Sequence, residues 1–226
     1  MEALGHAGSA VGICTGEGIV LAAEKKVTSK LLEPLKTSEK MYKIDSHISA
    51  AVAGITADAN VLVNYARTAS QRYYFTYQEP MPVEQLVQVI CDMKQGYTQF
   101  GGQRPFGVSA LYAGWDKKFG FQLLQSDPSG NYNGWKASAI GQNSSAAQGL
   151  LKQEYDDGMT LAKGKALALK CMTKTMNNTS LTPERLEFAI FFREGDEVVY
   201  RSLRDDEVKA LISEHEETAQ AEGMDE

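Results

Sequence analysis

Histidine and cysteine are the side chains that most often hold metals or act as nucleophiles, and this chain of 226 residues contains few of either. Its three histidines have no second type of ligand at metal-binding spacing: His6, His47 and His215. We therefore expect no metal site and no cofactor. The three cysteines form no C-x-x-C pair, and their odd number and wide separation are typical of a reducing compartment: Cys14, Cys91 and Cys171.

Other common catalytic and binding motifs are also missing from the sequence. There is no G-x-S-x-G nucleophile motif, and the pair Gly16 and Gly18 lacks the third glycine of a dinucleotide-binding loop. Asn143-Ser-Ser and Asn177-Asn-Thr match a glycosylation triplet, but the first residues show no secretory signal, so we interpret both triplets as loops. General motifs alone therefore predict a protein that is not an enzyme.

The charges are unevenly distributed along the chain. There are 23 Lys and Arg residues against 29 Asp and Glu residues, a formal net charge of −6. Six acids and no bases lie between Glu214 and Glu226, so the rest of the chain is neutral. A neutral body argues against a nucleic-acid partner, and no apolar run reaches the ~18 residues of a membrane span. We predict one domain over residues 1–213 and an acidic, disordered tail over 214–226.

The hydrophobic pattern alternates between groups of strands and pairs of helices. Strands separated by helix pairs favour α+β layering over a doubly wound sheet, and the continuously apolar run from Gly107 to Ala113 predicts a strand buried on both faces. We therefore expect two stacked sheets with helices outside. The predicted strands cover 9–14, 19–23, 41–44, 48–53, 107–115, 119–125, 132–140, 185–192 and 197–203, and the predicted helices start at about 56, 83, 145, 161 and 205.

Four segments resemble the α-type subunits of the eukaryotic 20S proteasome: Ser38-Glu-Lys-Met-Tyr-Lys-Ile, Val52-Ala-Gly-Ile-Thr-Ala-Asp-Ala, Tyr97-Thr-Gln-Phe-Gly-Gly-Gln-Arg-Pro-Phe-Gly-Val-Ser and Asp127-Pro-Ser-Gly-Asn-Tyr. The resemblance runs from about Met1 to His215, in the order and at the spacing of the family. Arg104-Pro-Phe-Gly and Asp127-Pro-Ser-Gly are typical of α-type rather than β-type chains. The resemblance implies a four-layer αββα sandwich of the N-terminal-nucleophile hydrolase class.

The β-type relatives are proteases, and their nucleophile is a threonine at a freed N-terminus, tuned by an acid and a lysine. Aligning Val11-Gly12-Ile13 with β-type chains places the nucleophile at Gly8, which has no hydroxyl. Ser9 cannot replace it, because neighbouring strand residues point to opposite faces. Glu24 and Lys40 stand at the acid and lysine positions. The resemblance therefore implies a non-catalytic subunit of a threonine-type endopeptidase complex.

Lys40 has two interpretations. In most proteins, a lysine at a strand entrance simply pairs with an acid such as Glu24. In α-type subunits, the matching lysine lies in a pocket between neighbouring subunits and receives the C-terminal carboxylate of a regulatory complex. The resemblance also implies that Gly8 and Gly54 line this pocket. We therefore name Lys40, Gly8 and Gly54 as a candidate binding site for activator C-termini.

The function implied by the resemblance is structural: assembly of the α ring, substrate gating and docking of regulators for ubiquitin-dependent protein degradation. The implied partners are neighbouring α subunits, β-ring subunits and regulatory or activator tails, in the cytoplasm and nucleus. Two alternatives stay open. The chain could be a β-type or related hydrolase that uses Ser9 after autocleavage, or a free-standing adaptor.

The start of the chain differs from the family pattern. Complete α subunits carry an N-terminal extension that contributes to the gate, whereas Met1 to Gly8 resembles only the last turns of the helix that follows it. Either the sequence is a fragment or the subunit lacks its gating segment. No gate residue can be assigned from these residues.

Overall fold

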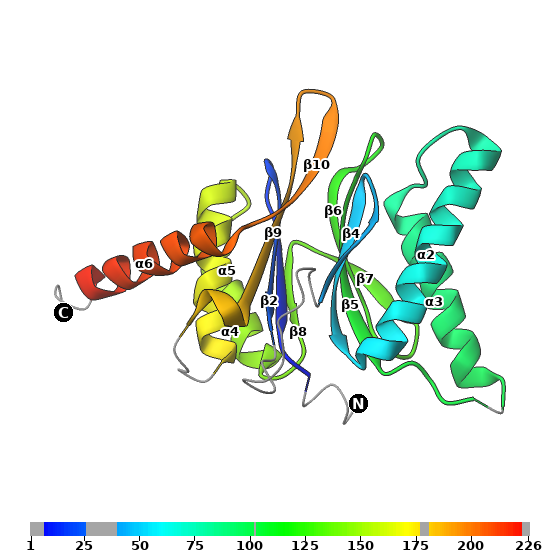
Figure 1. Ribbon diagram of the computed structural model, residues 1–226, viewed down its shortest axis with the longest axis horizontal. Helices are drawn as coiled ribbons and strands as arrows, with labels where there is room; N and C mark the ends of the chain where they lie inside the picture. Colours follow the sequence, from blue (N-terminus) through cyan, green and yellow to red (C-terminus); the bar gives the residue numbers. More distant parts are fainter. Residues whose placement is uncertain (1–6, 26–39, 102, 177–180, 223–226) are drawn as a thin grey trace.

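The computed structural model describes residues 7–25, 40–101, 103–176 and 181–222 (Figure 1). Its elements, in chain order, are β1 (Ala10–Cys14), β2 (Gly18–Glu24), β3 (Met41–Asp45), β4 (Ile48–Gly54), α2 (Thr56–Tyr77), α3 (Val83–Gln99), β5 (Val108–Asp116), β6 (Gly120–Ser126), β7 (Tyr132–Trp135), β8 (Ala137–Ile140), α4 (Ser144–Glu154), α5 (Leu161–Thr175), the 3-10 turn η1 (Pro183–Arg185), β9 (Leu186–Glu194), β10 (Glu197–Ser202) and α6 (Asp205–Glu222).

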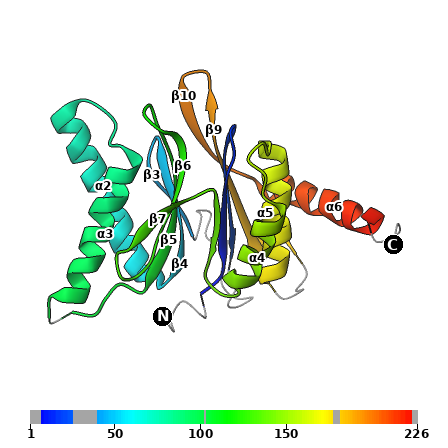
Figure 2. The same ribbon diagram turned by 180° about the vertical axis from the view of Figure 1, so that it is seen from behind.

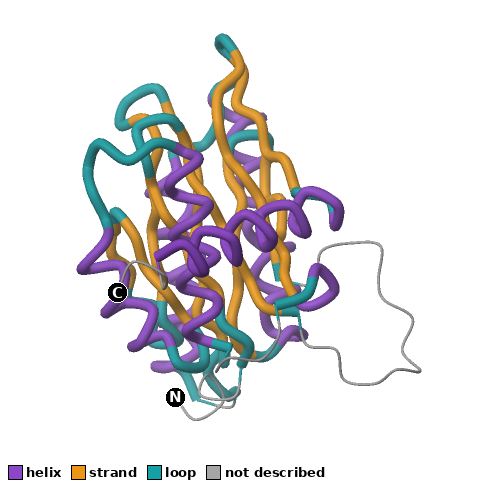
Figure 3. The backbone as a smooth tube through the Cα atoms, turned by 90° about the vertical axis from the view of Figure 1, so that its left-hand side faces the viewer, coloured by secondary structure: helices purple, strands orange, loops and turns teal. Residues whose placement is uncertain are grey.

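The strands form two five-stranded sheets that face each other, with strand orders β10-β9-β2-β1-β8 and β3-β4-β5-β6-β7. Helices α4 and α5 cover the outer face of the first sheet, and α2 and α3 cover the outer face of the second (Figures 1 and 2). Helix α6 extends away from the sandwich beyond α5, and Figure 3 shows this helical layer in front of the strands. This arrangement confirms the predicted four-layer α+β sandwich.

Apolar side chains fill all three spaces between the layers, and β1 shows how the strands divide them. Val11 and Ile13 are fully buried against α5, while Ala10 is buried between the two sheets. This alternation follows from the two-residue period of a strand. Both faces of the central strands are therefore buried, as the apolar run from Gly107 to Ala113 predicts.

One predicted strand is wrong in an informative way. Residues 132–140 do not form a single strand, because the chain leaves one sheet at Lys136 and joins the other. β7 pairs with β6 in the second sheet, and β8 pairs with β1 in the first. The run has the aromatic Trp135 just before Lys136 and Ile140 after it, with no proline or turn motif between them, so its local pattern does not reveal the crossing.

The end of the chain also differs from the prediction. Helix α6 continues past Ser213 to Glu222, into the segment for which the sequence predicts a disordered tail. Residues 1–6, where the gating extension would join the domain, lie outside the described residues. Over the described ranges, no helix is both long enough and apolar enough to cross a membrane.

Candidate functional site

The three candidate site residues lie at one end of the sandwich. Gly8 precedes β1, Lys40 precedes β3 and Gly54 ends β4. Because β3 and β4 are antiparallel, the beginning of β3 lies beside the end of β4. The Val52 amide accordingly donates to the Lys40 carbonyl at 3.0 Å, and Gly54 follows two residues later on the same strand.

Gly8 and Lys40 are in direct contact. A Cβ atom on residue 8 would overlap the Nζ of Lys40 and would lie 3.2 Å from Oε2 of Glu24. The lysine and the acid therefore converge on the position at which β-type chains carry their nucleophile. Ala7 continues the chain behind this position, and its carbonyl accepts a hydrogen bond from the Gln142 amide at 2.9 Å. Residue 8 thus offers neither a hydroxyl nor a free amine.

Carboxylates surround Lys40 at this end of the sandwich. The Nζ of Lys40 is buried, and its backbone amide donates to Oε2 of the buried Glu187 at 3.4 Å. Glu24 accepts from the Ser9 amide at 3.4 Å and forms an ion pair with Arg185 at 3.8 Å. Glu24 is thus held by Ser9 and Arg185, and its Oε2 lies on the same side of Gly8 as the lysine.

Ser9 points away from this cluster. Its side chain is fully buried and donates to Oγ1 of Thr175, at the end of α5, at 2.9 Å. Thr175 in turn donates to the Met172 carbonyl at 2.9 Å. Ser9 therefore occupies the α5 side of the sheet, and Gly8 the side that faces Lys40. The expectation that neighbouring strand residues point to opposite faces holds here.

Gly54 has a structural reason for lacking a side chain. Its φ of 134° lies in a region that L-residues rarely adopt, and a Cβ there would overlap the carbonyl oxygen of Gly107. The next residue, Ile55, donates its amide to that same carbonyl at 3.0 Å. The backbones at the end of β4 and just before β5 therefore lie too close together to leave room for a side chain on residue 54.

An ion pair missed at the sequence level stands beside Gly54. Arg104 donates from Nη1 and Nη2 to the two carboxylate oxygens of Asp58, at 2.6 and 2.8 Å. Asp58 Oδ2 also accepts from the Gly107 amide at 3.0 Å. The Arg104 guanidinium holds the pKa of the Asp58 carboxyl below its ordinary value, because the charged form accepts these hydrogen bonds. Both residues belong to the α-type segments quoted above. Their opposite charges were the only sequence feature that could have predicted the ion pair.

A second missed residue is Lys94, which is fully buried under the α-type turn at Asp127. Its Nζ donates to Ser126 Oγ at 2.8 Å, to the Val108 carbonyl at 3.0 Å and to the Asp127 carbonyl at 3.4 Å. Burial lowers the pKa of Lys94 to about 8. Lys94 lies seven residues after Val87, on the apolar stripe of α3, and this spacing could have predicted its burial.

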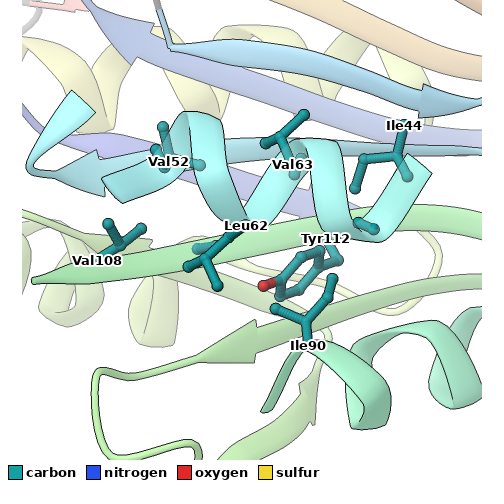
Figure 4. A pocket seen from close by; sticks show the side chains of 11 residues that line it. Ile44, Val52, Leu62, Val63, Ile90, Val108 and Tyr112 are labelled. Carbon is teal, nitrogen blue, oxygen red and sulfur yellow. The ribbon is translucent and has the colours of Figure 1, made fainter. Parts of the chain in front are cut away.

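Among the described residues, the cysteines and the potential metal ligands form no further site. All three cysteines are free, and burial raises the pKa of Cys14 and Cys91 to about 11 and that of Cys171 to about 12, which makes them poor nucleophiles. The described part of the chain contains no cluster of three potential metal ligands. A cavity between α2 and the second sheet measures only about 10 Å³ and is lined by apolar groups such as Leu62 and Val108 (Figure 4), so it is a packing defect.

Comparison with known proteins agrees with this geometry. The family described as "Proteasome subunit" matches residues 5–191. A proteasome subunit alpha type-4 from Petunia hybrida is 60% identical over 212 residues, which cover 94% of this chain and 85% of the relative. Proteasome subunit alpha type-4-1 from Oryza sativa subsp. indica is 61% identical over 215 residues (94% and 86%). Proteasome subunit alpha type-4-A from Arabidopsis thaliana is 59% identical over 216 residues (95% and 86%).

These relatives confirm the α-type prediction, and they do not favour the alternative of a hydrolase that uses Ser9. The chain belongs to the proteasome subunit family.

Proposed function

We propose that this chain is a structural, non-catalytic subunit of the α ring of the 20S proteasome. The observation that carries the proposal is at residue 8, where a glycine replaces the nucleophile and Lys40 fills the space of the missing side chain. An acid and a lysine without a nucleophile cannot form an acyl intermediate. The proposal places the chain in ubiquitin-dependent degradation as a building block and regulator-docking surface, within a complex whose threonine-type peptidase activity lies in other subunits.

Exposed apolar surface supports an assembled subunit over a free-standing adaptor. Helix α2 exposes Phe75 to 83% and Tyr77 to 62%. Tyr77 also lines a groove of about 550 Å³ between α2 and the start of α3, together with residues such as Tyr65, Tyr73 and Met81. Exposed aromatic side chains and apolar grooves of this kind are typical of protein interfaces. In the proposal, neighbouring α subunits and β-ring subunits cover such surface.

We further propose that Lys40 receives the terminal carboxylate of an activator tail, with Gly8 and Gly54 lining the pocket. The lysine Nζ lies below the surface, beside Gly8 and Glu24. In the proposal, the tail reaches it between neighbouring subunits. A charge-assisted hydrogen bond there would contribute roughly 1.5–3 kcal/mol, enough to anchor a short chain end. Docking at this point would couple the subunit to substrate gating. The free cysteines are compatible with a location in the cytoplasm and nucleus, which we include in the proposal.

The test is a Lys40→Ala subunit assembled into complete 20S particles. A synthetic activator-tail peptide with a free carboxylate should bind these particles at least 10-fold more weakly, which corresponds to a loss of about 1.4 kcal/mol or more. Lys43→Ala is the matched control, because Lys43 is an exposed lysine on β3, the strand that follows Lys40. Unchanged affinity in the Lys40→Ala particles would show that this pocket does not hold the tail.

A further inference from the structure

The pair Arg104 and Asp58 is built to fix a backbone position. Two parallel hydrogen bonds join the guanidinium to both carboxylate oxygens, the arrangement that gives an Arg–carboxylate pair its directional specificity. Asp58 is only 7% exposed, whereas the side chain of Arg104 is 64% exposed. The arginine therefore lies on the surface, and the group that it orients lies inside.

A chain of hydrogen bonds connects this pair to the end of β4. Oδ2 of Asp58 accepts from the Gly107 amide, and the Gly107 carbonyl accepts from the Ile55 amide. Ile55 follows Gly54, whose missing side chain would overlap that same carbonyl. Gly107 therefore contacts both Gly54 and Asp58, next to the ladder in which Gly54 pairs with Val108 of β5.

The first turn of α2 contains Asp58 and therefore lies beside Gly107. Helix α2 begins after Ile55, which supplies no side-chain cap. Asp58 is the acidic residue of the first turn. A carboxylate there is stabilised by the positive end of the helix dipole. Gly107 also packs closely on Ile55, since a Cβ on it would lie 2.8 Å from Cδ1 of that side chain. The Asp58 carboxylate thus connects Arg104, Gly107 and the first turn of α2.

We propose that Arg104 is a positioning residue of the tail-binding pocket: through Asp58 and Gly107 it holds the backbone at Gly54, at the same end of the sandwich as Lys40. This inference rests on the proposed docking function of Lys40. It assigns a role to the Arg104-Pro-Phe-Gly segment, which otherwise only marks the chain as α-type. Arg104 acts through the backbone and does not touch the tail.

The experiment uses complete 20S particles that carry Arg104→Ala, Arg104→Lys, Asp58→Asn or both Arg104→Ala and Asp58→Asn in this subunit. The probes are one activator-tail peptide with a free carboxylate and the same peptide as its C-terminal amide. Lys136→Ala is the matched control, because it breaks an exposed ion pair with Asp157 of 2.6 Å beyond the other end of β1. Native mass spectrometry verifies incorporation of each variant.

We expect Arg104→Ala to weaken binding of the carboxylate peptide about 5- to 10-fold and to reduce the ratio of carboxylate to amide affinity. A general loss of stability would leave this ratio unchanged. Arg104→Lys should restore part of the affinity, because one hydrogen bond to Asp58 can still form. The double variant should bind no more weakly than Asp58→Asn alone, and Lys136→Ala should bind like the wild type.

The two proposals fail in different ways. Wild-type affinity and selectivity in Arg104→Ala particles, alongside weakened Lys40→Ala particles, would overturn the positioning role and leave the pocket intact. Wild-type affinity in Lys40→Ala particles would overturn the pocket itself and the inference with it. If Arg104→Ala does not enter the particle, the ratio of carboxylate to amide affinity is measured in Arg104→Lys particles instead. A ratio equal to that of the wild type in these particles contradicts the role of Arg104.

Discussion

The Nζ of Lys40 occupies the space that a side chain on Gly8 would need. In a β-type protease, a lysine at this position assists a threonine nucleophile, and here it replaces the nucleophile's side chain in space. Glu24 remains within 3.2 Å of the same point. The acid and the lysine are thus present without a nucleophile, which is the relationship expected of a structural subunit built on an enzyme fold.

Restoring a hydroxyl at residue 8 should not restore peptidase activity. Gly8→Thr would push its side chain into Lys40 Nζ, and Ala7 would still block the α-amine. We expect no hydrolysis of fluorogenic peptides by the purified variant, and a free energy of unfolding lowered by about 1–3 kcal/mol in urea titrations. Gly16→Ala is the control, because no atom lies within 4 Å of the added Cβ and its stability should barely change. Peptide cleavage by the Gly8→Thr variant that the wild type does not show would contradict the assignment.

Ser9 should prove to be a structural residue. Ser9→Ala removes the buried hydrogen bond to Thr175 Oγ1, so we expect the free energy of unfolding to fall by about 1 kcal/mol. In the Ser9→Ala background, Thr175→Val should lower the free energy of unfolding by less than it does in the wild type, because the two hydroxyls share one hydrogen bond. N-terminal sequencing of the native subunit gives the second readout. A mature chain that begins at Ser9 would support the hydrolase alternative instead.

Lys94 should make stability depend on pH in the alkaline range. Its pKa is lowered from 10.5 to about 8 by burial, so between these values the unfolded chain holds more protons than the folded one. Stability from this group therefore rises as the pH increases from about 8 to 10.5. Relative to Lys94→Met, the wild type should gain about 2–3 kcal/mol over this range.

Urea titrations of the full chain at several alkaline pH values measure this difference. Taking the difference between the wild type and the variant removes the titrations of tyrosine and cysteine that both proteins share. Lys43→Met is the matched control, because this side chain is exposed, and its difference from the wild type should stay nearly constant. A flat difference for Lys94→Met as well would mean that the buried amine does not titrate in this range.

Asp58 should make stability depend on pH in the acidic range, with the opposite sign. Its folded pKa lies below the ordinary value of 3.8, so its contribution is fully present above about pH 4 and is lost as the pH falls through the folded pKa. The gap in stability between the wild type and Asp58→Asn should therefore narrow below pH 4. Thermal unfolding between pH 3 and 7 measures this gap. A constant gap would show that the carboxylate charge contributes nothing.

The sequence by itself determined the layer order, because groups of strands and pairs of helices are recorded in local periodicity. It also determined that residue 8 has no hydroxyl and that Ser9 and Gly8 face opposite sides, since alternation is a local property of a strand. The α-type resemblance needed only short segments such as Arg104-Pro-Phe-Gly. Each of these features depends on residues close together in the chain.

Other features were decided only by the tertiary structure. The run over residues 132–140 crosses between sheets at Lys136, which depends on the partners β6 and β1 and not on its own residues. Lys94 is fully buried because three oxygen acceptors from other elements meet it there. Lys40 fills the space beside Gly8, although 31 residues separate them in the sequence. Such contacts arise when layers pack, and local periodicity carries no record of which distant groups will then meet.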